Sequence, residues 1–271
     1  MTPPEPDAHD DAHDKAPAGL TCDEFLGGRL RILQPAGGYR AGIDPVLLAA
    51  GVPARAGQSV LDLGCGVGVA TLCLGRRVPG LRLAGLELQP DYADLARRNA
   101  VANGIALEVV TGDLTAMPAS LRARRFDHVI ANPPYFDARR RTAAADPGRE
   151  TALAGETPLA AWVAQAARRC APGGHVSMIL AAERLPELLE HAARHLGSLE
   201  LLPLVPRPGG LARRVLLRAR KGGRAPLRLH HGWVLHRGTR HETDGDDYTA
   251  QTQAILRAGA ALPFGPARAS K

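Results

Sequence analysis

Short apolar runs alternate with helix-type patterns from about residue 58 to residue 196, and this alternation constrains the fold more than any other feature of the sequence. The apolar runs predict buried strands at 60–63, 81–86, 106–110, 126–131 and 175–180. The helix-type patterns fall between and after these runs, at 69–78, 91–102, near 115–121, 158–170 and 183–196. Strands that alternate with helices build right-handed βαβ units, so the sequence predicts a doubly wound α/β fold.

Two further apolar runs, 199–205 and 212–220, follow the last of these helices and predict two more strands. The loop at 206–210 that joins them contains no helix, whereas parallel neighbours need a long crossover. These strands are therefore expected to form an antiparallel hairpin at the sheet edge. The predicted fold is a Rossmann-like, seven-stranded, mostly parallel sheet with that hairpin. Residues 226–258 are expected to add an apolar segment and a short helix near 246–257.

No linker-like composition divides residues 20–271, which are expected to form a single domain with a C-terminal extension from about residue 222. Residues 1–19 are rich in Pro, Asp, His and Ala and are predicted to be a disordered tail. The His and Asp side chains of this tail could chelate a metal in principle, but metal ligands need a scaffold, so no metal is expected. The chain is expected to act as a monomer or a homodimer.

The chain has four cysteines, Cys22, Cys65, Cys73 and Cys170, which form neither a CxxC pair nor a zinc-type spacing. Free thiols in a reducing cytoplasm are the simplest interpretation. No apolar run approaches the length of a membrane span, and the N-terminus lacks a signal-peptide pattern, so no membrane partner is expected. The formal net charge of +7 comes almost entirely from arginine. Such a charge suits a polyanion such as nucleic acid, although an arginine-rich surface also serves solubility alone.

A glycine-rich turn joins the first predicted strand to the first helix. Asp62 is followed at alternate positions by Gly64, Gly66 and Gly68, with Cys65 between the first two glycines. The third glycine comes one residue earlier than in the dinucleotide fingerprint G-x-G-x-x-G, which disfavours a nicotinamide oxidoreductase. This spacing, with an acid two residues before the first glycine, favours S-adenosyl-L-methionine. Taken alone, the turn is also compatible with a plain glycine turn.

Two more acids stand at predicted strand ends. Glu87 ends the second strand and could accept hydrogen bonds from both hydroxyls of an adenosine ribose. Asp113 follows the third strand and could accept from an adenine amino group. Leu88 and Leu114 come directly after these acids and are included in the predicted cofactor site. Each acid alone is compatible with a helix N-cap or a solvated loop, but acids at three successive strand ends together favour cofactor binding.

The segment Asn132-Pro133-Pro134-Tyr135 follows the fourth predicted strand. Two consecutive prolines cannot donate to a sheet ladder, so the strand must stop there. The stiff turn fixes the main-chain carbonyls of Asn132 and Pro133 and the Asn132 side-chain amide, so that all can face one planar amine. The alternative is an ordinary Pro-Pro loop.

Together these motifs resemble those of class I S-adenosylmethionine-dependent methyltransferases, and the Asn-Pro-Pro-Tyr form resembles the subset that methylates amines. Upstream, residues 37–49 look like the N-terminal segment of the tRNA(Val) adenine-N6 methyltransferase family. The resemblance covers about residues 22–258, and it implies that Arg40, Gly42 and Asp44 lie near the cofactor. Asp44 followed by proline is equally compatible with a helix N-cap and a first-turn proline.

The resemblance implies methyl transfer to an exocyclic amine, namely adenine N6 in tRNA, with the four residues of the Asn-Pro-Pro-Tyr turn as the catalytic set. The hypothesis is that the Asn132 side-chain oxygen and the Pro133 carbonyl accept the two amine hydrogens, by positioning and electrostatics. Tyr135 would stack on the base, and Phe136 either adds to that wall or belongs to the core.

The polar stretch 137–150 follows this turn and carries the four arginines Arg139, Arg140, Arg141 and Arg149. We expect it to order on a phosphate backbone, which predicts an RNA substrate, although it could also be a surface loop with incidental charge. Three alternatives stay open: N5-glutamine methylation of a release factor, N2-guanine methylation of ribosomal RNA, and a non-catalytic cofactor- and RNA-binding module.

Overall fold

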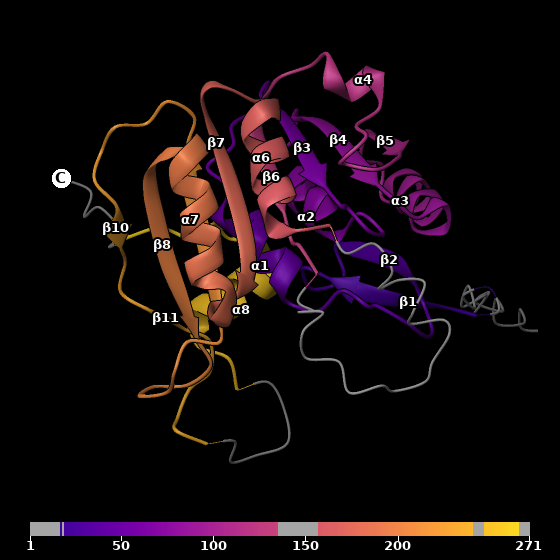
Figure 1. Ribbon diagram of the computed structural model, residues 1–271. Coiled ribbons are helices and arrows are strands. Elements are labelled where there is room, and N and C mark those ends of the chain that lie inside the picture. The colour runs from indigo at the N-terminus through magenta and orange to yellow at the C-terminus, as the bar shows by residue number, and fades with distance from the viewer. Residues whose placement is uncertain (1–16, 18, 135–156, 241–246, 266–271) are drawn as a thin grey trace, which may run out of the picture.

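The computed structural model describes residues 17, 19–134, 157–240 and 247–265 of the chain. A nine-stranded sheet with the order β10-β8-β9-β7-β6-β3-β4-β5, and with β11 paired to β8, forms its centre (Figure 1). The long strands are β3 (Ser59–Leu63), β4 (Arg82–Glu87), β5 (Leu107–Thr111), β6 (Phe126–Ala131), β7 (Cys170–Ala181), β8 (Gly197–Val205) and β9 (Arg214–Arg220). β3 to β7 pair in parallel, and β9 pairs antiparallel to both β7 and β8. The predicted doubly wound sheet and its antiparallel hairpin are confirmed.

The sheet edge differs from the prediction. β9 lies inside the sheet, between β7 and β8, so β8 is the outer strand of the hairpin. Two short strands, β10 (Arg228–Leu229) and β11 (Trp233–Val234), then pair in parallel with the outer side of β8. The C-terminal extension thus covers backbone groups that an exposed edge strand would leave unpaired.

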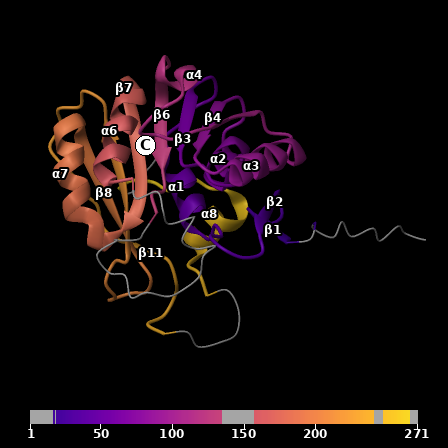
Figure 2. The ribbon, with the colours of Figure 1, turned by 45° about the vertical axis from the view of Figure 1, so that its right-hand side comes forward.

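Helices cover both faces of the sheet, as Figures 1 and 2 show from two directions. One layer contains α1 (Asp44–Gly51), α2 (Val69–Arg77), α3 (Pro90–Ala102) and α8 (Ala250–Ala258). The other contains α4 (Ala119–Arg122), α6 (Leu159–Arg169) and α7 (Leu185–His195). Successive strand residues enter opposite cores: Ile130 packs in the first, whereas Val129 and Ala131 pack in the second. A parallel sheet buried on both faces requires this continuous apolar pattern, which is why the strands read as apolar runs.

β7 begins earlier than predicted. The Pro-Gly-Gly sequence before residue 175 is expected to stop the preceding helix, which ends at Arg169, and the strand extends back through these residues to Cys170. The Gly173 amide donates to the Lys221 carbonyl at 2.9 Å, and the Lys221 amide donates to the Gly174 carbonyl at 2.9 Å. The backbone of β9 therefore satisfies these glycines, and partner pairing overrides their local preference for a turn. The helix predicted at 183–196 likewise divides into a 3₁₀ turn, η2 (Ala182–Arg184), and α7.

A separate antiparallel hairpin, β1 (Leu20–Phe25) and β2 (Leu30–Pro35), precedes the large sheet and was not predicted. Asn99 of α3 and Asn103, the C-cap residue of this helix, hold the hairpin in place. The Asn99 side chain accepts from the Leu33 amide at 2.8 Å and donates to the Leu33 carbonyl at 3.0 Å. One turn further on, Asn103 makes the same pair of bonds to Arg31, at 3.0 and 2.8 Å. These side chains thus replace a third strand along the outer edge of β2.

Asn99 is fully buried and also donates to the carbonyl of Val67, in the glycine-rich turn, at 3.0 Å. The hairpin, the helix and the glycine turn therefore meet at one side-chain amide.

None of the helices in the described segments is both long and apolar enough to span a lipid bilayer. The predicted tail at 1–19 falls almost wholly outside the described residues, so the domain limits stay a prediction.

Replacing Asn99 with Ala should lower the free energy of unfolding by roughly 2–4 kcal/mol, because buried amide and carbonyl groups of Leu33 and Val67 lose their partners. Urea denaturation would measure the change. Asn103→Ala is the matched control, since its contacts to Arg31 are exposed, and it should cost about 1 kcal/mol or less. Equal effects of the two substitutions would contradict the special role of Asn99.

Candidate active site

Four predicted site residues come together at the carboxyl edge of the parallel strands. Asp62 lies near the end of β3, Glu87 ends β4, Asp113 follows β5, and Asn132 follows β6. These strands are adjacent, in the order β6-β3-β4-β5. The chain leaves β3 toward β4 on one side and returns to β6 on the other, so a topological switch point lies between β3 and β6. Ligands of open α/β sheets bind in the crevice at such a point.

The glycines of the turn serve different purposes. Gly64 has φ +66°, and a Cβ there would lie 2.5 Å from the Trp162 ring, so packing alone demands glycine. Gly66 has φ +55° and faces open space, which leaves room for a ligand to approach the backbone. Gly68, with φ +91°, is the N-cap of α2. The Cys65 side chain is buried against Gly85, so only its main chain can reach a ligand.

Glu87 joins the end of β4 to the glycine turn. Its carboxylate accepts from the Gly66 amide at 2.8 Å and from the Gln89 amide at 2.9 Å. Burial raises the pKa of Glu87, and these main-chain donors oppose the rise. The acid is thus held beside the open face of Gly66, where a ribose would lie.

Asp62 is almost completely buried behind the turn. The Thr71 hydroxyl of α2 donates to its carboxylate at 2.6 Å. Burial raises the pKa of Asp62 to about 7, and the nearby charge of Glu87 adds to the rise, while the Thr71 bond opposes it. The charge of this acid therefore changes near neutral pH.

Asp113 accepts from the Thr115 amide at 2.7 Å, which is the local turn expected of a loop acid. Leu114 beside it is buried, whereas Leu88, directly after Glu87, is half exposed. A large apolar side chain exposed at the site offers a surface for a planar ring. The position of Leu88 in the sequence did not indicate that its side chain is exposed.

The segment before α1 is tied to other elements. Arg40 forms an ion pair with Asp23 of β1, at 2.7 Å, and Asp44 forms one with Arg214 of β9, at 2.9 Å. The interpretation of Asp44 as an N-cap is wrong, since α1 begins at Asp44 and its N-cap residue is Ile43. Gly42 is exposed, with open space where a Cβ would stand.

Tyr39 is a site residue that the sequence did not reveal. Its hydroxyl accepts from the Asn132 side-chain amide at 3.4 Å. The Tyr92 hydroxyl donates to the Tyr39 carbonyl at 3.2 Å and so fixes the backbone there. Tyr39 is half exposed; its partial burial raises its pKa, and the charges of Asp44 and Asp62 add to the rise. The contact joins residues 93 positions apart, a separation that no local pattern reports.

The Asn-Pro-Pro turn itself is partly covered. Pro133 is buried and Asn132 is half-buried. The Pro134 carbonyl accepts from the Arg184 guanidinium of η2 at 3.2 Å. Several predicted residues lie outside the described residues, and their roles stay predictions: Tyr135, Phe136, Arg139, Arg140, Arg141 and Arg149. Over the described ranges, the fold brings together no group of three or more metal-ligating side chains.

The strand order, the glycine turn with open Gly66, and acids at three neighbouring strand ends define a class I S-adenosylmethionine-dependent methyltransferase. The chain belongs to the methyltransferase small domain family, whose description matches residues 40–199. Among curated relatives, a tRNA1(Val) (adenine(37)-N6)-methyltransferase of Porphyromonas gingivalis is 32% identical over 185 residues, 65% of this chain and 72% of the relative. A release factor glutamine methyltransferase of Chlorobaculum tepidum is 35% identical over 93 residues, 33% of this chain and 32% of the relative.

Solved structures share the fold. A crystal structure described as a predicted O-methyltransferase from Agrobacterium tumefaciens has a TM-score of 0.67 and 25% identity, and the match covers 82% of this chain and 99% of that one. The 16S rRNA N2 G1207 methyltransferase of Thermus thermophilus, in complex with AdoMet and guanosine, has a TM-score of 0.51 and 22% identity over 74% of this chain and 50% of that one. At that identity the second match shows the fold alone.

Asp62→Asn should make the cofactor-free protein more stable at pH 8. The folded-state pKa of Asp62, about 7, exceeds the ordinary value of 3.8, so wild-type stability falls as pH rises between these values. The variant lacks this cost and should gain roughly 2–4 kcal/mol at pH 8, a gain that vanishes near pH 4. Urea unfolding across this pH range measures it; parallel curves for the two proteins would disprove the assignment.

Tyr39→Phe should lower methyl-transfer turnover about tenfold, equivalent to about 1.4 kcal/mol, because the Asn132 amide loses the hydroxyl that orients it. Cofactor affinity should not change. In an Asn132→Ala background the same substitution should have no further effect on turnover. A general structural role of Tyr39 would instead lower turnover in both backgrounds, and the double-mutant cycle separates the two.

Proposed function

We propose that the protein transfers a methyl group from S-adenosyl-L-methionine to the N6 amine of an adenine in tRNA. The observation that carries the proposal is the Asn132-Pro133-Pro134 turn at the switch point of the sheet, beside Glu87 and the open face of Gly66. The similarity to adenine-N6 methyltransferases over 65% of the chain supports the substrate class.

The cofactor supplies an electrophilic methyl on a sulfonium, so the task left to the protein is to prepare a weak nucleophile. An adenine amine is delocalised into its ring. Acceptors at the Asn132 side-chain oxygen and the Pro133 carbonyl would bind its hydrogens and localise the lone pair. Tyr39 assists by accepting from the nitrogen of the Asn132 amide, which turns the amide oxygen the other way.

This role demands a rigid turn, and the described residues supply rigidity from three sides. Pro133 is buried, the Pro134 carbonyl is bound by Arg184, and the Asn132 amide is bound by Tyr39. Positioning of this kind supplies much of the rate enhancement when no covalent chemistry is asked of the protein. An RNA substrate would place the enzyme in the cytoplasm, where tRNA is modified.

Two other acceptors fit the same turn. The release factor relative supports a glutamine amide, but over 33% of the chain only. An N2 amine of guanine presents the same planar geometry. Both are separated from adenine by incubation of the protein with labelled S-adenosylmethionine and total tRNA, ribosomal RNA or release factor, followed by analysis of the modified nucleoside or amino acid. N6-methyladenosine from tRNA is expected; label only in another acceptor, or in none, would overturn the proposal.

Asn132→Ala should reduce turnover on tRNA by about 10²–10³-fold, because the amine loses a positioned acceptor. Cofactor binding, followed by calorimetry, should persist, since Glu87 and the glycine turn are untouched. Val101→Ala, at a side chain of α3 that is 83% exposed, is the control. Turnover of the Asn132 variant within threefold of wild type would refute the assignment.

A further inference from the structure

A continuous series of contacts runs outward from the catalytic turn along the carboxyl edge of β7, β9 and β8. Arg184 of η2 binds the Pro134 carbonyl. The first residue of η2, Ala182, donates to the Arg213 carbonyl at 3.1 Å, just before β9 begins. The Arg213 amide in turn donates to the Leu204 carbonyl of β8 at 3.2 Å. These contacts form one connected rim, made of Pro134, η2 and the β8–β9 loop.

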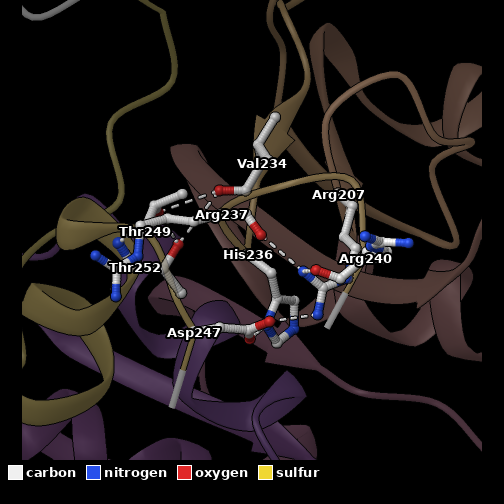
Figure 3. A network of polar contacts seen from close by, with 8 residues as sticks. All are labelled: Arg207, Val234, His236, Arg237, Arg240, Asp247, Thr249 and Thr252. Carbon is white, nitrogen blue, oxygen red and sulfur yellow. Dashed lines mark hydrogen bonds and ion pairs between the residues drawn. The ribbon is translucent and has the colours of Figure 1, made fainter. Parts of the chain in front are cut away.

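The same edge carries a basic turn in the C-terminal extension. The chain follows β8 past its end, since the amides of Leu235 and His236 donate to the carbonyls of Val205 and Pro206, each at 2.9 Å. It then turns through residues 237–240, where Arg237 and Arg240 are both exposed. Figure 3 shows this turn beside the Arg207 side chain.

One side chain anchors this basic turn. Arg207 of the β8–β9 loop donates to the carbonyls of Arg237 and Arg240, at 2.7 and 3.0 Å (Figure 3). Asp247 binds the Arg207 guanidinium and also Nδ1 of His236, whose ring stacks on Tyr248 with centroids 4.5 Å apart. The turn is thus ordered before any partner binds, which reduces the entropy lost on association.

Three acids near this rim pair with arginines: Asp44 with Arg214, Glu187 with Arg184, and Asp247 with Arg207. Arg213 and Arg237 are exposed, and no carboxylate among the described residues pairs with either. Exposed guanidinium groups on an ordered backbone suit a partner with regularly spaced anionic oxygens.

We infer that Arg213 and Arg237 belong to a basic rim that binds the phosphate backbone of the substrate RNA and presents the target base to the Asn132 turn. The inference rests on the proposed function for the identity of the RNA. Phosphate contacts of this kind fix register and orientation without reading sequence. The rim is carried by the β8–β9 hairpin and by the C-terminal extension, beyond the part of the chain that the family description covers.

The test is a double variant, Arg213→Glu with Arg237→Glu. Its KM for tRNA should rise at least about tenfold at 0.15 M salt, and the slope of log K against log salt should flatten by about 1–2, while kcat at saturating tRNA stays within twofold. The matched control is Arg122→Glu with Arg168→Glu, two exposed arginines at the ends of α4 and α6 on the opposite edge of the sheet. The control should change KM less than about threefold.

A second variant tests the ordered conformation of the basic turn separately from its charge. Arg207→Lys keeps the charge but lacks the guanidinium fork, in which one nitrogen donates to both carbonyls and the other binds Asp247. It should raise KM about threefold with an unchanged salt slope. Rim variants that match the control in KM and salt slope would overturn the inference, as would a loss confined to kcat. Wild-type protein that binds tRNA with the expected salt dependence but does not methylate it would instead defeat the proposed function, so the two failures are distinguishable.

Discussion

The buried side-chain amide of Asn99 is the interaction on which the site depends. It joins three segments: α3, the glycine turn at Val67, and β2 at Leu33. Once β2 is docked, its Gln34 side chain accepts from the Ala41 amide at 2.8 Å and donates to Asp23, which holds Arg40. The hairpin therefore fixes the segment between it and α1. This segment contains Tyr39, which contacts Asn132. A buried amide that satisfies three backbone groups is hard to replace, because any smaller side chain leaves polar groups unpaired.

The electrostatics of the site follow from the placement of acids at neighbouring strand ends. Parallel strands bring Asp62 and Glu87 to one edge, where burial raises the pKa of both and the charge of Glu87 adds to the rise at Asp62. The structure tolerates this because Thr71 donates to Asp62, and the amides of Gly66 and Gln89 donate to Glu87. Burial of these acids therefore costs stability at the carboxyl edge of the sheet, and perturbed acids of this kind are typical of functional sites.

Much of this architecture could be predicted from sequence, because each strand of a buried parallel sheet appears as an apolar run. The same runs place Asp62, Glu87 and Asn132 at neighbouring strand ends, where the structure has them, and their roles stay predictions. The hairpin β1–β2 was not, since its stability comes from Asn99 and Asn103, 66 to 72 residues away. Tyr39 was missed for the same reason. The start of β7 was placed five residues too late, because Gly173 and Gly174 pair with Lys221, a partner that no local pattern reports.

The arginines show why composition alone does not identify a binding surface. Many of them are structural: Arg77 donates to the carbonyls of Ala49 and Val52 at the end of α1, and Arg76 donates to the Asn103 carbonyl at the end of α3. Such cations satisfy helix C-termini and complement the helix dipole, so they need no partner molecule. Arg169 serves the end of α4 in the same manner. Arg214 at the start of β9 and Arg207 after β8 are structural as well, since they pair with Asp44 and Asp247. Arg213 and Arg237, by contrast, are exposed on the same edge of the sheet as the Asn132 turn, and no carboxylate among the described residues pairs with either.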